Sequence, residues 1–138
     1  INRLQQNLSS IRKIAGWSAE TLGNKIGVTK QTISNLENKK TPMTFTQYIA
    51  IRTVLDAEIE TNKDNEALPK VISILLDSVD SIDDNEYKEV QKSVETVAAT
   101  ASGGVASSAL LGLLGAISPL AVSLIGTATL VNWKKLLK

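Results

Sequence analysis

Apolar residues recur at helical intervals along most of the chain, and this pattern predicts an all-α protein. In the first 60 residues they define four short stretches, 3–15, 18–26, 29–38 and 44–55. Residues three or four positions apart share one face of an α-helix, so each stretch has one side that can be buried.

Residues at the ends of these stretches have the chemistry of helix caps. Gly16 and Gly27 follow the first two stretches, and glycine readily takes the left-handed conformation of a helix C-terminus. Ser18 and Thr29 precede the second and third, where a hydroxyl accepts a hydrogen bond from a free backbone N–H. Thr44, with a glutamine three positions later, has the spacing of a capping box. We therefore expect four helices joined by short turns.

The chain becomes polar and acidic after residue 55, and residues 61–68 are predicted to form a linker. Pro69 suits the first position of a new helix, because that position needs no backbone N–H. The polar residues Asp83, Asp84 and Asn85 would end this helix. The apolar residues of the next predicted helix alternate in steps of three and four, as in a short coiled-coil seam. They are Tyr87, Val90, Val94, Val97 and Ala101.

Charge is distributed unevenly along the chain. Residues 1–55 contain eight Lys or Arg and two Glu, which is a net charge of +6. Residues 56–95 contain four basic and twelve acidic residues, a net charge of −8, and residues 96–138 contain three Lys and no acid. Such asymmetry between segments indicates a nucleic-acid or membrane partner.

The composition also excludes several kinds of chemistry. The chain has no Cys and no His, which removes disulfides, thiolate nucleophiles, Cys/His zinc sites and histidine acid–base catalysis. No spacing of carboxylates or lysines argues for catalysis either. We expect a protein that is not an enzyme and that needs neither a cofactor nor a metal.

The third predicted helix, 29–38, has one apolar side and one polar side. At about 100° per residue, Ile33 and Leu36 lie opposite an arc of four polar residues, which are Lys30, Gln31, Ser34 and Asn35. Gln and Asn can pair with adenine through two hydrogen bonds, and Lys can reach the acceptors of guanine. A solvated helix face would have the same composition. The alternative to a base-reading surface is therefore an ordinary exposed surface.

The stretch from Trp17 to Thr41 resembles the lambda Cro and repressor family, often called Xre-type, and the resemblance covers residues 4–56. Its most specific segments are Ile26-Gly27-Val28-Thr29, Ile33-Ser34 and Leu36-Glu37-Asn38. The resemblance implies a bundle of four or five helices whose third helix enters the major groove of double-stranded DNA.

Roles for single residues follow from the same resemblance. It implies base contacts from Lys30, Gln31 and Asn35, with Ser34 near a base or a phosphate. It implies phosphate contacts around Thr29, Asn38, Lys39 and Lys40. It also places Arg12 against Glu37 as a half-buried ion pair, where the alternative is two independent surface charges. Gly23 stands where the family usually has Ala, and we expect it to weaken its helix by up to ~1 kcal/mol.

The segment from Thr96 to Trp133 carries no formal charge over 38 residues. One membrane span over 109–131 would be about 35 Å long, enough for a hydrocarbon core of ~30 Å, but it would place the last lysines outside the cell. A membrane hairpin that turns near residues 118–119 would have a short second arm. The third possibility is a helical core between subunits. Small residues at four-residue spacing would permit close helix contact in lipid or in protein, and they are Gly104, Ser108, Gly112 and Ala116.

Together these observations predict a DNA-binding domain at 1–60, the linker at 61–68 and a helical oligomerisation or membrane-associating region at 69–138. We expect a sequence-specific transcriptional regulator, a repressor, that binds a two-fold symmetric operator as a homo-oligomer in the cytoplasm. The alternative is an antitoxin-like regulator, or one tethered to the inner face of the cell membrane, whose residues 96–133 bind a protein partner or lipid.

Overall fold

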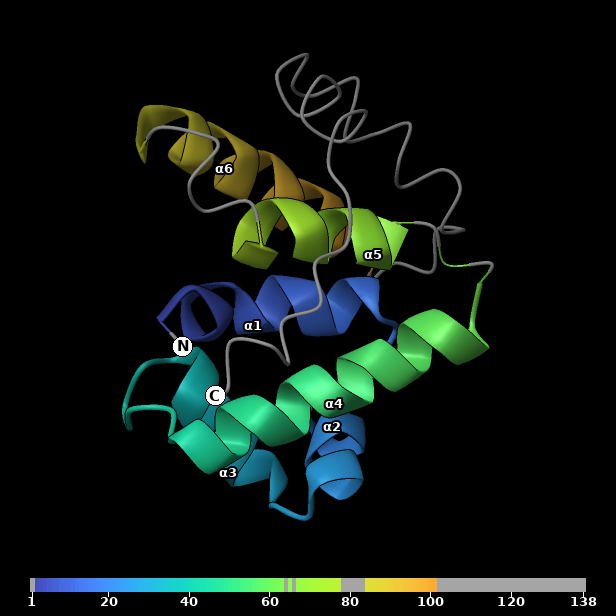
Figure 1. Ribbon diagram of the computed structural model, residues 1–138. Coiled ribbons are helices and arrows are strands. Elements are labelled where there is room, and N and C mark those ends of the chain that lie inside the picture. Colours follow the sequence, from blue (N-terminus) through green and yellow to red (C-terminus); the bar gives the residue numbers. More distant parts are fainter. Residues whose placement is uncertain (1, 64, 66, 78–83, 102–138) are drawn as a thin grey trace.

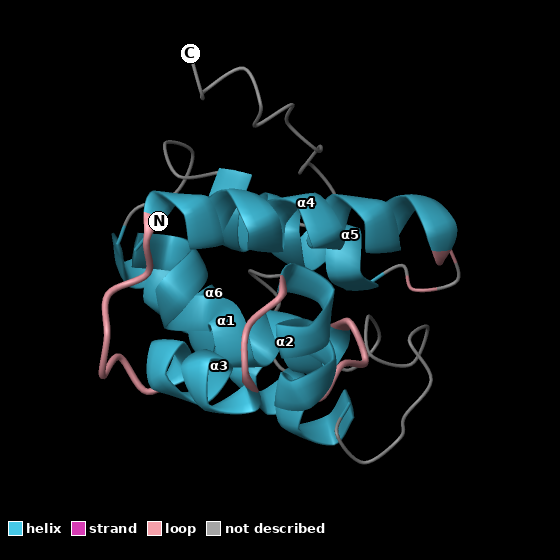
Figure 2. Cartoon of the chain, turned by 90° about the horizontal axis from the view of Figure 1, so that it is seen from below, coloured by secondary structure: helices cyan, strands magenta, loops and turns pink. Residues whose placement is uncertain are grey.

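The computed structural model describes residues 2–63, 65, 67–77 and 84–101 of the 138-residue chain. Within these residues all regular structure is helical, which confirms the all-α fold (Figure 2). The elements are α1 (Asn2–Ile14), α2 (Ala19–Ile26), α3 (Lys30–Glu37), α4 (Phe45–Thr61), α5 (Ala67–Ile72), the π-helical turn η1 (Ser73–Asp77) and α6 (Asp84–Ala101). The predicted oligomer contacts Gly104, Ser108, Gly112 and Ala116 lie outside the described residues.

The predicted caps are present in the structure. The hydroxyls of Ser18 and Thr29 accept hydrogen bonds from backbone N–H groups in the first turns of α2 and α3. Thr44 and Gln47 form a complete capping box at the start of α4. Gly27 ends α2 with a φ of +78°, in the left-handed region that glycine adopts at low cost. The sequence therefore determines where α2, α3 and α4 begin.

Two helix boundaries differ from the expectation. α4 continues beyond Leu55 to Thr61, because residues 56–61 contain no Gly or Pro and Ile59 packs against the core. α5 begins before Pro69, at Ala67. The buried Asn65 sets this start, since its Oδ1 accepts a hydrogen bond from the N–H of Leu68. Pro69 is tolerated because a proline in the first turn of a helix removes no intrahelical hydrogen bond.

α1 is the central helix of the described structure. Figure 1 shows it between α5 and α6 on one side and the group formed by α2, α3 and α4 on the other. Leu4, Leu8 and Ile11 are at most 1% exposed, and α1 contacts α3, α5, η1 and α6. Because α1 is covered from two sides, polar residues such as Asn7 and Ser10 are also buried on it.

The apolar face of α6 packs against other helices of the same chain. Tyr87, Val90, Val94 and Val97 are all buried, and α6 packs against α1. The spacing that resembles a coiled coil therefore serves packing within one subunit. Among the described residues, no helix is both long and apolar enough to cross a membrane.

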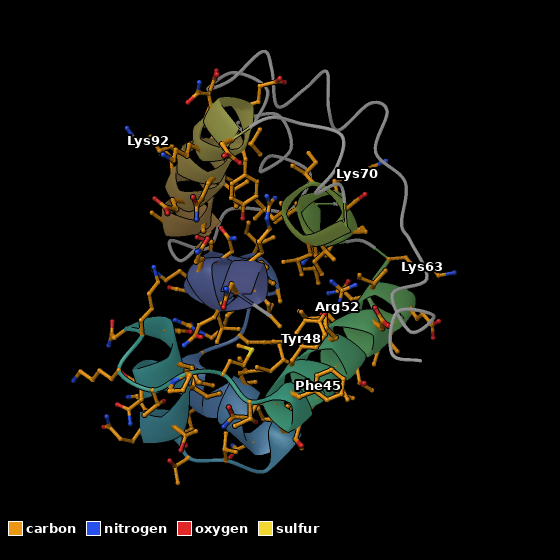
Figure 3. The ribbon with its side chains drawn as sticks, turned by 60° about the vertical axis from the view of Figure 1, so that its left-hand side comes forward. Phe45, Tyr48, Arg52, Lys63, Lys70 and Lys92 are labelled. Carbon is orange, nitrogen blue, oxygen red and sulfur yellow. The ribbon has the colours of Figure 1, made fainter. Side chains whose placement is uncertain are left out.

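The outer side of α4 carries an exposed aromatic residue. Figure 3 shows Phe45, Tyr48 and Arg52 following one another along this helix. Phe45 is 54% exposed and stacks on Tyr48, with ring centroids 6.4 Å apart. Arg52 is directed inward and is only 2% exposed. Arg52 therefore belongs to the interior of the bundle, although its charge adds to the basic character of residues 1–55.

Candidate nucleic-acid interface

The turn between α2 and α3 is tight. A Cβ atom at Gly23 would lie 2.7 Å from the carbonyl oxygen of Val28, a backbone atom that has no rotamer by which to move away. The N–H of Val28 also donates a hydrogen bond to the carbonyl of Gly23. The tight turn therefore explains why this chain has glycine at position 23. It leaves no room for the alanine that the family usually has there.

α3 separates its buried and exposed sides as its sequence predicts. Ile33 and Leu36 are completely buried, and they hold α3 against α1 and α2. The opposite side presents Lys30 and Gln31, which are exposed, and Ser34 and Asn35, which are half-buried. The structure thus brings the four predicted base-reading residues together on one surface.

Two of these side chains are bonded to each other. The amide nitrogen of Gln31 donates to Oδ1 of Asn35 at 2.9 Å. This leaves Gln31 with its carbonyl oxygen and one N–H, and Asn35 with two N–H donors. An acceptor beside a donor matches the edge of adenine in the major groove, and the donors of Asn35 match acceptors such as guanine O6 and N7 or thymine O4.

The predicted phosphate contacts lie at both ends of α3. Thr29 caps the start of the helix, where its hydroxyl accepts from the N–H of Thr32 at 3.1 Å. Asn38 ends the helix, and its amide donates to Oγ of Ser34 at 3.3 Å. Lys39 and Lys40 follow and are exposed. Lys39 has a φ of +59°, which is the one positive φ at a non-glycine residue in the described ranges.

The structure contains the expected pair between Arg12 and Glu37. Nε of Arg12 lies 2.5 Å from Oε2 of Glu37, and Nη2 donates to Oε1 at 3.1 Å. The remaining Nη1 donates to the backbone carbonyl of Trp17 at 2.8 Å. Both charged side chains are 12% exposed. The two bonds to Glu37 fix the end of α3 to α1, and the bond to Trp17 fixes the segment before α2.

Gln5 is a structural residue that the sequence pattern did not reveal. Its amide nitrogen donates to the carbonyls of Leu36 and Thr41, at 3.1 and 2.8 Å. Its Oε1 accepts from the N–H of Met43 at 3.1 Å. One side chain on α1 thus holds the whole loop that follows α3. In the sequence, only its position next to Leu4, on the predicted buried face, indicates a structural role for Gln5.

Asn7 is a second residue that was not predicted. Its amide nitrogen donates to the hydroxyl of Tyr87 at 2.6 Å, and its Oδ1 accepts from the amide of Gln91 at 3.1 Å. The guanidinium of Arg3 lies over the ring of Tyr87, 3.9 Å from the centroid. These polar contacts join α6 to α1 on the side away from α3. Asn7 follows Arg3 at a helical interval, which indicates a second, polar stripe on α1.

No group of acidic residues in the described part of the chain could hold a metal ion. Residues 8–61 match the family model described as helix-turn-helix. No curated protein matches the chain, and no solved structure does. The match spans the cap at Ser18, the tight turn at Gly27 and the two-sided α3. Residues 8–61 form a helix-turn-helix domain of the Xre and lambda Cro-like type, which is a DNA-binding domain.

Proposed function

We propose that this protein is a sequence-specific transcriptional regulator that reads the major groove with α3 and acts as a repressor. The observation that carries the proposal is the bonded pair of Gln31 and Asn35 on the exposed side of α3. Their free donors and acceptor lie on the exposed side of α3, and the exposed Lys39 and Lys40 that follow the helix can meet phosphates. Such a surface can distinguish base pairs, whereas a merely basic surface binds all DNA alike.

In this proposal the residues divide into two groups. Lys30, Gln31 and Asn35 meet base edges, with Ser34 beside them. The residues at the two ends of α3 meet the sugar–phosphate backbone, which fixes the helix in the groove without reading sequence. These residues are Thr29, Asn38, Lys39 and Lys40.

We further propose that the protein acts as a homo-oligomer on a two-fold operator. One small module offers a limited DNA interface, and a pair of modules on two half-sites is the usual solution. The 38 uncharged residues between Thr96 and Trp133 support this, because such a segment needs apolar surroundings. The small residues Gly104, Ser108, Gly112 and Ala116 are the proposed contacts. The same segment favours the second candidate, a regulator whose residues 96–133 bind a protein partner or lipid.

Selection of bound duplexes from a random pool tests the proposal. The full chain, residues 1–101 and the Gln31→Ala variant of the full chain are compared. We expect the full chain to enrich two inverted half-sites, residues 1–101 to enrich one half-site, and Gln31→Ala to lose preference at one base position. A reporter promoter overlapping the enriched site should be repressed.

Two results would contradict parts of this proposal. Absence of any enriched sequence would reject sequence-specific binding. Enrichment of a single half-site by the full chain, together with a monomeric mass in sedimentation, would reject the oligomer. Recovery of the full chain in carbonate-washed membranes, or with a stoichiometric protein partner, would favour the second candidate.

A further inference from the structure

An open pocket lies between the first turns of α1 and the loop that follows α3, and most of the residues that line it have polar side chains. Its volume is about 280 Å³, several times the ~30 Å³ that one water molecule occupies in the liquid. The residues that line it are Asn2, Gln5, Gln6, Lys39, Thr41 and Pro42. None of them is acidic. The pocket therefore suits an anion.

The lining residues have two separate roles. Gln5 uses both hydrogens of its amide nitrogen and its oxygen in bonds to the loop, so it builds the wall of the pocket. Asn2, Gln6 and Lys39 are exposed, and no hydrogen bond joins their side chains to the described residues. These three supply amide N–H donors and one positive charge. A tetrahedral oxyanion needs this combination of several donors and a cation.

The conformation of Lys39 supports a role in binding. Its positive φ is unfavourable for a residue with a side chain. Glycine would satisfy this backbone at lower cost, but it would leave the pocket without its cation. Strained residues of this kind cluster at binding sites, where the surrounding structure holds them. Here Gln5 supplies that support, through its bonds to residues on both sides of Lys39.

We propose that this pocket holds a phosphate of the DNA backbone, beside the groove that α3 reads, and that Asn2 and Gln6 of α1 are DNA-contacting residues. The inference rests on the proposed DNA-binding function. Continuity favours a DNA phosphate over a free anion, since Lys39 joins the pocket directly to Asn38 and Lys40 at the end of α3. α1 would then contact DNA in addition to forming the centre of the hydrophobic core.

The first test adds a negative charge to the pocket of the full chain. Gln6→Glu is compared with Ala57→Glu, which adds the same charge at an exposed position in the far half of α4. Binding is measured on a random-sequence duplex, because a phosphate contact does not depend on sequence. We expect Gln6→Glu to weaken binding about tenfold through like-charge repulsion, and Ala57→Glu to weaken it less than about twofold.

The second test uses a neutral substitution and a neutral DNA group. Single phosphates of a duplex are replaced by methylphosphonate, and binding is measured for the wild-type chain and for Gln6→Ala. Replacement of one particular phosphate should weaken DNA binding by the wild-type chain several-fold. The same replacement should not weaken binding by Gln6→Ala any further. This coupling identifies the phosphate in the pocket. It also remains informative if Gln6→Glu does not fold.

The outcomes distinguish failure of the pocket proposal from failure of the proposed function. If the wild-type chain binds no duplex, the proposed function fails and the pocket proposal fails with it. If the wild-type chain binds, but Gln6→Glu equals Ala57→Glu and no phosphate is coupled to Gln6, only the pocket proposal is overturned. Inorganic phosphate that competes with DNA no better than chloride at equal ionic strength supports a DNA phosphate. If inorganic phosphate competes saturably and the DNA affinity of Gln6→Glu is unchanged, the pocket is a site for free anions. That result overturns the proposal.

Discussion

Arg12 of α1 and Glu37 of α3 meet in an ion pair with two hydrogen bonds, and both side chains are 12% exposed. The pair lies at the end of α3, directly before the loop with Lys39 and Lys40. A third bond, from Arg12 to the carbonyl of Trp17, extends the contact to the segment before α2. Arg12 thus helps to fix the orientation of α3 on the bundle, together with Gln5 and the buried side chains of α3.

Removal of one partner of this pair should cost more than removal of both. Arg12→Met leaves a half-buried carboxylate without its cation, which we expect to lower the free energy of unfolding by about 3 kcal/mol. Arg12→Met combined with Glu37→Met should lower it by less. Urea unfolding of the two single variants and the double variant measures the coupling. Lys13→Met, which removes a neighbouring charge outside the pair, is the control, and additive effects at Arg12 and Glu37 would contradict the coupling.

Base reading and phosphate contact should respond differently to alanine. Gln31→Ala or Asn35→Ala should weaken binding to the selected site by ~1–3 kcal/mol and relax the preference at one base position. Because the two side chains are hydrogen-bonded, the double variant should lose less than the sum of the single losses. Lys40→Ala should weaken all duplexes similarly and flatten the dependence on salt. Equal losses on selected and random DNA for all three variants would count against these roles.

Gly23→Ala should destabilise the domain although alanine is the better helix former. The gain in helix propensity is at most ~1 kcal/mol. The new methyl group meets the carbonyl oxygen of Val28 at 2.7 Å, and overpacking of this kind costs ~1–3 kcal/mol. Thermal unfolding should show a lower Tm for Gly23→Ala. Asn24→Ala, at the next and exposed position of α2, should leave the Tm unchanged or raise it, and an equal rise in both variants would show that the turn can widen.

Lys39→Gly should stabilise the fold and weaken DNA binding. Glycine relieves the positive φ of this position, a gain of up to ~1 kcal/mol. The same change removes a cation from the predicted DNA surface. Lys40→Gly is the matched control, since it removes an equal charge where no positive φ favours glycine. Denaturant unfolding and duplex binding should move in opposite directions for Lys39→Gly alone.

The helices after α4 should stabilise the DNA-binding domain. α5, η1 and α6 cover one side of α1 and bury apolar residues such as Leu68, Val71 and Val90. Each such side chain contributes ~1.5–3 kcal/mol when buried, so residues 1–61 should be less stable than residues 1–101 by at least ~3 kcal/mol. Tyr87→Phe, which removes only the partner of Asn7, should cost about 1 kcal/mol. Equal stability of the two fragments would show that the two parts fold independently.

The sequence was sufficient for features that depend on neighbouring residues. The caps at Ser18, Thr29 and Thr44 are local, because a hydroxyl and a backbone N–H two or three positions later determine them. The two-sided character of α3 is local for the same reason. The pairing of Arg12 with Glu37 was available only through the resemblance, since 25 positions separate the two residues and no periodicity relates them.

Long-range polar contacts were not predictable in the same way. Gln5, Asn7 and Asn65 form bonds across 31 to 84 positions, and in the sequence they are ordinary polar residues. α1 also appeared to have a single buried face, because Leu4, Leu8 and Ile11 satisfy the pattern alone. Its second face includes buried polar residues, whose burial is explained by the helices that cover this side, α5, η1 and α6.

Gln5 and Asn7 couple two distant regions of the protein through α1. The two residues stand two positions apart on one rigid helix, where Gln5 holds the loop after α3 and Asn7 holds α6. A substitution at Tyr87 or Gln91 can therefore tilt or loosen α1 and reach the loop through it. In a screen for defective regulators, alleles in α6 should fall into the same phenotypic class as alleles at Gln5, although no residue of α6 belongs to the predicted DNA surface.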